Sequence, residues 1–234
     1  MTDWTAFGVP ADVPVAQNTS YFSVGENLIF TESFYVNPQH SINITAASGV
    51  RTFSMQNLSF GLVNYPTVAG LLSPVSQYMQ NLLVEADTHV FFNPAFRGLG
   101  LPHYAWSTFA NLMEVVTRGQ FDCSTDMQDG VEYGFCISYT GCASFTNVWK
   151  YAFQVYFNGG ANTNYINVPL STFAFDYIDE TGSQYCQIYA EYLDPYQPQS
   201  SNVIMGAMFF QSFVGIFTDI PNGSTPVINL QLYV

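Results

Sequence analysis

The sequence predicts an all-β fold, built from antiparallel sheets with one or two short helices, and three observations support this class. First, apolar and polar residues alternate, or aromatic residues cluster, along four long segments, as strands with one buried face require. These segments are 20–36, 40–61, 149–159 and 225–234. Second, turn-forming residues follow several of them. Third, helical periodicity is confined to two short stretches.

The strand segments can be justified in chain order. Segment 20–36 is rich in aromatic residues and is followed by Asn37-Pro38, a dipeptide that favours a turn. Segment 40–61 alternates between apolar and polar residues. Segment 149–159 leads into "NGGAN", which is typical of a hairpin turn. Further turns are predicted at 179–182 and 194–195, and the last strand lies in 225–234.

The stronger helical signal covers residues 101–116. Pro102 suits an early helical position and Gly119 a stop. Apolar residues recur between them at helical spacing, which predicts one buried face. They are Trp106, Phe109, Leu112, Met113 and Val116. A weaker helix candidate is 71–83. Residues 1–17 are expected to form an extended lead-in, or the end of a missing N-terminal lobe, and 18–234 a single domain.

The charge balance excludes one class of partner. Seventeen acidic residues face only four basic ones, which gives a net charge of −13. A nucleic-acid partner requires a basic stripe that neutralises phosphates, and four cations cannot build one. Anionic membrane surfaces are disfavoured for the same reason. The longest apolar stretch, 203–217, is too short for a transmembrane segment.

Sequons and cysteines predict a secretory environment. Asn18, Asn43, Asn57 and Asn222 each begin an N-x-[ST] sequon, although unused sequons in a cytosolic protein remain an alternative. The four cysteines contain no C-x-x-C pair and allow three pairings, so two disulfides in an oxidising compartment are favoured over a metal site. The first residues do not have the pattern of a signal peptide. We therefore expect the chain to be a mature piece, or a fragment, of a longer secreted, extracellular or luminal precursor.

One stretch suggests a catalytic loop. In "VEADTHVFF" (84–92), an apolar strand pattern ends in Asp87-Thr88-His89. A proline and the predicted helix follow it. Later in the chain come the cysteines, and then "VIMGAMFFQSFVGIFTD" (203–219), in which two apolar residues precede Gly206.

The order of these motifs resembles the C-terminal lobe of pepsin-like aspartic proteases, over residues 18–234. The resemblance implies a pepsin-like lobe in which "ADTHVFFNP" stands where the family has its Asp-Thr-Gly loop, with Asp87 as the catalytic residue. It also implies that the segment around Gly206 lies beside that loop. It pairs Cys142 with Cys186 as the lobe's disulfide, which leaves Cys123–Cys136 as the second bridge.

The sequence departs from the family where the chemistry is most demanding. His89 replaces a glycine that lets the backbone approach the catalytic carboxylates. Phe91 replaces a hydroxyl residue that supports the Asp, and Ala207 replaces the Asp that usually follows Leu-Gly. An aspartic protease also needs two carboxylates that share a proton, one from each lobe. Asp87 has no such partner in a single lobe.

The favoured interpretation is a secreted or luminal glycoprotein domain, a catalytically impaired pseudoprotease that acts in protein binding or assembly. One alternative is half of an active aspartic endopeptidase, whose second Asp comes from an N-terminal lobe outside this chain. Others are a structural or adhesive glycoprotein domain that shares only the fold, and an unrelated all-β protein. The expected partner is another polypeptide, either a protease N-lobe or an assembly subunit.

Two weaker features of the sequence accompany this interpretation. Asp87 and His89 are more often a local pair than metal ligands with His103, so no metal and no cofactor are predicted. The tyrosine-rich segment 183–197 is typical of an interface patch, because tyrosine is enriched at interfaces.

Overall fold

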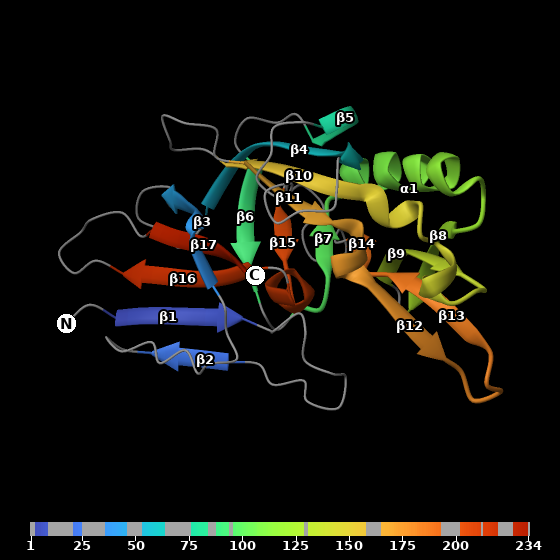
Figure 1. The fold of residues 1–234 in the computed structure, drawn as a ribbon. Coiled ribbons are helices and arrows are strands. Elements are labelled where there is room, and N and C mark those ends of the chain that lie inside the picture. Colours follow the sequence, from blue (N-terminus) through green and yellow to red (C-terminus); the bar gives the residue numbers. More distant parts are fainter. Residues whose placement is uncertain are drawn as a thin grey trace.

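The computed structural model describes twelve stretches of the chain, and all structural statements below concern them. These stretches are 3–8, 21–24, 36–45, 53–63, 76–83, 88–93, 96–128, 131–157, 165–192, 202–211, 213–219 and 227–233. Their secondary structure is mainly β, arranged in three sheets, with one α-helix and several short 3-10 helices in the described stretches (Figure 1). The predicted all-β class is confirmed at this level.

The largest sheet is mixed and has eight strands. Its order is β11-β10-β4-β6-β15-β7-β14, and β5 also pairs with β4. The strands are β4 (Phe53–Val63), β5 (Ser76–Leu83), β6 (Thr88–Phe92), β7 (Leu99–Leu101), β10 (Tyr151–Phe157), β11 (Tyr165–Pro169), β14 (Ala190–Tyr192) and β15 (Val203–Met205). Two of the pairs, β15 with β6 and β14 with β7, are parallel. The prediction of purely antiparallel sheets was therefore wrong.

A five-stranded antiparallel sheet joins the two ends of the chain. Its order is β2-β1-β16-β17-β3. The strands are β1 (Asp3–Gly8), β2 (Tyr21–Val24), β3 (Val36–Thr45), β16 (Phe213–Asp219) and β17 (Val227–Tyr233). β1 pairs with β16, β16 with β17, and β17 with β3, and Figure 1 shows β1 beside β16. The expected lead-in thus contains a strand, β1, that pairs with β16 near the other end of the chain.

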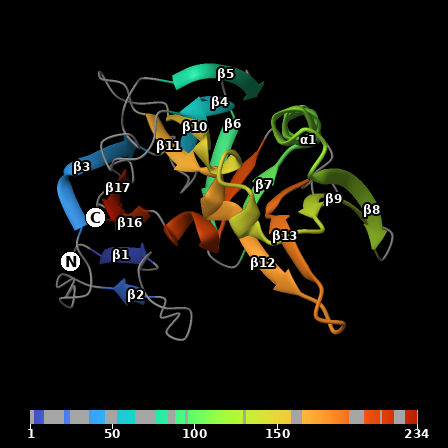
Figure 2. The same ribbon diagram turned by 45° about the vertical axis from the view of Figure 1, so that its right-hand side comes forward.

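The third sheet has four antiparallel strands in the order β12-β13-β9-β8. These are β8 (Asp122–Gln128), β9 (Val131–Ser138), β12 (Ala174–Ile178) and β13 (Gln184–Ile188). Figure 2 shows the β12–β13 hairpin projecting from the body of the molecule. The predicted turn at 179–182 closes this hairpin. Its Asp179 carboxylate accepts hydrogen bonds from backbone N–H groups of Thr181 and Ser183, and Gly182 takes a positive φ of 84°.

The predicted helix at 101–116 is confirmed as α1 (His103–Thr117). Pro102 precedes its first residue, and Arg118 and Gly119 end it in the left-handed region, with φ of 54° and 72°. The 3-10 helices are η3 (Cys142–Ser144), η4 (Val148–Lys150), η5 (Leu170–Phe173) and η7 (Ala207–Gln211).

Aromatic contacts hold α1 against the eight-stranded sheet. The Phe109 ring lies 5.1 Å from the Phe60 ring and 5.2 Å from the Phe153 ring, and all three side chains are buried. Trp106 anchors the start of the helix, because its Nε1–H donates to the Ala190 carbonyl at 3.2 Å. Each such aromatic pair stabilises the fold by about 0.5–1.5 kcal/mol beyond the burial of its area.

Two local predictions were wrong, each because sheet pairing outweighed a local signal. The helix candidate 71–83 contains β5 instead, which pairs with β4. The strand signal over 40–61 is confirmed, and it covers parts of two strands, β3 and β4, which belong to different sheets. Asn37-Pro38 lies inside β3, at the place where the β3–β17 register shifts. A proline is tolerated there because a bulge needs no regular ladder hydrogen bond.

Candidate functional site

The two motifs of the expected site lie side by side in the large sheet. Strand β15, which carries the two apolar residues before Gly206, runs parallel to β6. Strand β6 begins at Thr88, directly after Asp87. Ile204 lies opposite Phe91, and Met205 opposite Phe92. The pairing is extended when the backbone N–H of Asn93 donates to the Met205 carbonyl at 3.0 Å. Segments that are far apart in sequence are thus brought together.

Gly206 is packed against backbone on two sides. Its N–H donates to the Gly98 carbonyl at 2.7 Å, and the next N–H, of Ala207, donates to the Phe96 carbonyl at 2.7 Å. A Cβ atom at position 206 would lie 2.4 Å from both of these carbonyl oxygens. The close approach of the 96–98 backbone therefore requires glycine after β15.

The loop residues that can be described are Thr88 and His89, while Asp87 lies outside the described residues. Thr88 is fully buried on β6. His89 is partly exposed and lies opposite Ser54 of β4. Its Nδ1 is buried and finds no hydrogen-bond partner among the described residues. An unpaired buried nitrogen is costly, so His89 is a polar feature of this loop without a structural explanation in the sheet.

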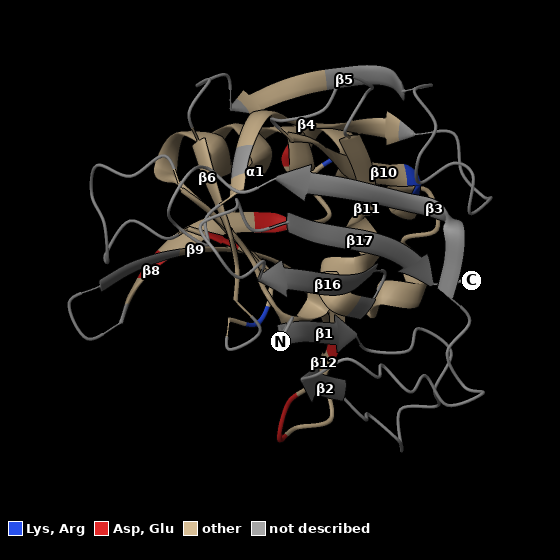
Figure 3. Ribbon diagram, turned by 90° about the vertical axis from the view of Figure 1, so that its left-hand side faces the viewer, with Lys and Arg blue, Asp and Glu red and all other residues tan. Residues whose placement is uncertain are grey.

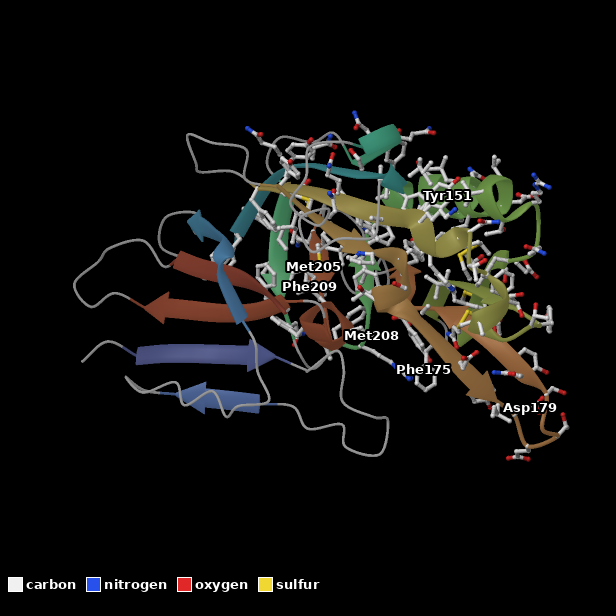
Figure 4. The ribbon with its side chains drawn as sticks, viewed as in Figure 1. Tyr151, Phe175, Asp179, Met205, Met208 and Phe209 are labelled. Carbon is white, nitrogen blue, oxygen red and sulfur yellow. A yellow bond between two sulfur atoms is a disulfide. The ribbon has the colours of Figure 1, made fainter. Side chains whose placement is uncertain are left out.

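Apolar side chains surround the other end of β6. The Phe92 ring lies 5.5 Å from Phe53, 5.6 Å from Phe209 and 6.3 Å from Phe210. Figure 4 shows Phe209 of η7 close to Met205 of β15. These rings carry no acid–base groups.

Both disulfide pairs that the resemblance implied are formed, and all four cysteines are used. Cys123 lies opposite Cys136 in the β8–β9 ladder, with their Cα atoms 4.0 Å apart. Cys142, at the start of η3, is bonded to Cys186 of β13, with their Cα atoms 4.7 Å apart. Two disulfides are typical of a protein from an oxidising compartment.

The structure describes the four sequons to different extents. Asn18 and Asn222 lie outside the described residues, and Asn43 belongs to β3, where only the backbone is described. Asn57 lies in β4, between β10 and β5. Its Nδ2 donates to the Ser59 hydroxyl at 3.1 Å and to Asn81 Oδ1 at 3.0 Å. The acceptor nitrogen of this sequon is therefore engaged within the sheet.

Of the residues weighed as metal ligands, His89 and His103 lie within the described stretches and Asp87 does not. No group of three or more His, Cys, Asp or Glu side chains gathers there around a common point. His103, at the start of α1, is exposed and its ring lies 4.9 Å from that of Tyr192. Nor is any described helix long and apolar enough to cross a membrane.

Sequence reasoning missed a cluster around Arg97. The guanidinium carbon of Arg97 lies 4.1 Å from the centre of the Tyr189 ring and 4.8 Å from that of Phe175. Burial raises the pKa of nearby Glu191, and the positive charge of Arg97 partly opposes this shift. The only signal in the sequence was an acidic residue within the aromatic stretch "YAEYLD", which has no specific meaning by itself.

A half-open pocket of ≈ 410 Å³ is lined by residues of α1 and β8, among them Glu114, Asp122 and Cys123. It involves none of the predicted catalytic residues. In comparisons with known proteins, no family model and no curated protein matches this chain.

Proposed function

We propose that this chain is a secreted or luminal glycoprotein domain with the fold of a pepsin-like C-terminal lobe, and that it is a pseudoprotease which acts in protein binding or assembly. The chain forms two disulfides, and this supports the oxidising compartment that the proposal requires. The binding role requires another polypeptide as a partner.

The pairing of β15 with β6 carries the proposal. The resemblance required the Asp-Thr-His loop and the Ile-Met-Gly segment to be neighbours, and a wide separation would have counted against it. Val203 lies opposite Val90, only two residues beyond Thr88. Gly206 has a packing role that no larger residue can fill. Both features support a lobe in which an apolar-apolar-Gly strand borders the catalytic loop.

The impaired chemistry follows from the residues around Asp87. A peptide-cleaving pair of carboxylates needs a second Asp, which one lobe does not supply. His89 places an imidazole where close backbone approach needs glycine. Phe91 cannot donate a hydrogen bond to a carboxylate. Small errors in the placement of an acid–base group cost large factors in rate, so we expect Asp87 to be a remnant of a catalytic residue.

A peptidase assay tests the proposal. The purified chain, with both disulfides intact, is incubated with an unfolded protein substrate at acid pH, with and without pepstatin. We expect no pepstatin-sensitive cleavage. We also expect the chain to co-purify with a stoichiometric partner polypeptide from its native source. Pepstatin-sensitive cleavage by the chain alone would overturn the pseudoprotease assignment, and a monodisperse monomer in the native source would overturn the binding role.

The identity of the co-purified partner distinguishes the pseudoprotease from the main alternative, which is half of an active aspartic endopeptidase. If the co-purified partner is a lobe with an intact Asp-Thr-Gly loop, and the complex cleaves the substrate only while Asp87 is present, then the chain is half of an active aspartic endopeptidase. An Asp87→Asn variant of the complex measures this dependence directly. Unchanged cleavage in that variant would remove Asp87 from the chemistry.

A further inference from the structure

One face of the four-stranded sheet carries a row of tyrosines. In the β12–β13 ladder Tyr177 lies directly opposite Tyr185, and their ring centres are 6.0 Å apart. On the other side of Tyr185, the ring of Tyr139 follows at 5.6 Å. We call Tyr139, Tyr177 and Tyr185 the tyrosine row. Phe175 continues it along β12, because residues two apart on a strand share one face.

The row is exposed at the edge of its sheet. Tyr139 is 73% exposed, Tyr177 48% and Phe175 43%. Among the described strands β12 pairs only with β13, so it is an edge strand. Figure 4 shows Phe175 near the base of the projecting hairpin and Asp179 at its tip. An exposed aromatic group beside an open strand edge is typical of a surface that binds an extended segment.

The charges beside the tyrosine row indicate the charge of the partner that can bind there. The hairpin turn carries Asp179 and Glu180, the hairpin has no lysine or arginine, and Figure 3 shows the acidic turn that follows β12. A hydrogen bond from the Thr181 hydroxyl is the main reason why the pKa of Asp179 lies below its usual value. Asp179 therefore stays ionised over a wide pH range. A cationic partner is complementary to this surface, and an acidic one is repelled.

A contact within the chain shows how aromatic rings beside this surface bind a cation. The Arg97 guanidinium lies over Phe175 and Tyr189, at 4.8 Å and 4.1 Å from the ring centres. Both distances are within the range of a cation–π interaction. Phe175 is thus one ring shared between this internal contact and the exposed row, while the rings of the tyrosine row offer further faces of the same kind.

We propose that the tyrosine row and the β12 edge bind an extended, arginine-rich segment of a protein partner, whose guanidinium groups stack on the rings while the hairpin carboxylates attract them. This inference rests on the proposed function, because it names the surface and the partner chemistry of the proposed binding role. A second copy of the chain is a poor occupant, since each copy has a net charge of −13 and only four basic residues.

The test uses the full chain and a labelled peptide in which arginine alternates with threonine. Fluorescence anisotropy at physiological salt measures its affinity, with a peptide that has glutamate in place of arginine as the negative control. We expect the arginine peptide to bind, and the double variant Tyr139→Ala/Tyr177→Ala to weaken binding by roughly tenfold, about threefold for each ring. Tyr177→Phe retains a ring and should bind within about twofold of the unchanged chain.

Tyr104→Ala is the matched control, because Tyr104 is 68% exposed on α1 and belongs to a different element. All of these variants keep the net charge, so a general attraction of cations affects them equally. Equal binding by the double variant, or no binding of the arginine peptide, would overturn the proposal. So would self-association that the double variant abolishes.

A second measurement avoids dependence on variants that fold poorly. In the unchanged chain with isotope-labelled tyrosines, the peptide should shift the ring signals of the tyrosine row and leave that of Tyr104 in place. Shifts confined to other tyrosines would refute the assignment. The peptidase assay is independent of this one. Acid peptidase activity together with peptide binding would overturn only the pseudoprotease function, and an inactive chain that fails to bind would overturn only this inference.

Discussion

The backbone N–H of Gly206 donates a 2.7 Å hydrogen bond to the carbonyl oxygen of Gly98, and neither residue has room for a side chain. A Cβ atom on Gly98 would lie 2.0 Å from the Tyr189 carbonyl oxygen, and one on Gly206 would lie 2.4 Å from that of Gly98. The end of β15, which lies beside the strand of the expected catalytic loop, is therefore held by contacts between backbones. Backbone atoms cannot move aside as the end of a flexible side chain can.

Gly206→Ala should therefore destabilise the chain by about 3 kcal/mol, the upper part of the usual range for overpacking. Urea denaturation measures the change. Gly141→Ala is the control, because the atoms nearest to its added Cβ would belong to the flexible side chain of Gln184, and its φ of −61° suits any residue. We expect that variant to change stability by less than about 1 kcal/mol. Equal losses in both would show that the contact at Gly206 has no special role.

The two disulfides should differ in their contribution to stability. Cys123–Cys136 closes a loop of 13 residues, and Cys142–Cys186 one of 44. Loop closure restricts the unfolded chain by about 3 kcal/mol for the shorter loop and about 4 kcal/mol for the longer one. Removal of each pair by double alanine substitution, followed by denaturant titration, compares them. A larger loss from the Cys123–Cys136 pair would contradict this order.

Asn57 is expected to carry little or no glycan in the secreted protein, although its sequon is intact. Its Nδ2 donates to two neighbours, and Ser59, the hydroxyl residue of the sequon, is only 3% exposed. A glycan there would have to leave β4 between two paired strands. Mass spectrometry of the glycopeptides measures occupancy. Asn57→Gln should not change the electrophoretic mobility, and a mobility increase comparable to the loss of one glycan would disprove the expectation.

Glu191→Gln should stabilise the chain at neutral pH. Burial raises the pKa of Glu191 above its ordinary value of 4.5, so the folded state holds this proton more tightly than the unfolded chain does. Folding stability therefore falls as the pH rises from about 4.5 through the raised pKa, and the cost remains at higher pH. Glutamine does not ionise, so the variant avoids this loss of folding stability.

Thermal unfolding across a pH series measures this effect. The advantage of Glu191→Gln should be present at neutral pH and should disappear when the pH falls below the ordinary pKa of a glutamate. Glu114→Gln, at an exposed position on α1, is the control and should show no comparable pH-dependent gain. An advantage that persists unchanged at acid pH would mean that packing, and not ionisation, is responsible.

Local signals in the sequence were sufficient for elements whose contacts lie within one segment. Helix α1 needed only its apolar face, Pro102 before it and Gly119 after it, because helical hydrogen bonds join residues close in sequence. The turn at 179–182 likewise contains its own partners, since Asp179 bonds to the next few residues. The pairing of the cysteines came from the order of motifs along the chain, since spacing alone left three possibilities.

Tertiary pairing decided the rest. Whether 76–83 forms a helix or a strand depends on the neighbouring β4, and whether β15 runs parallel or antiparallel depends on β6. The tyrosine row likewise joins residues from three separate segments. A strand satisfies its backbone hydrogen bonds with partners that lie far away in sequence. Residue patterns along the chain therefore identify a strand, while only the folded sheet determines what lies beside it.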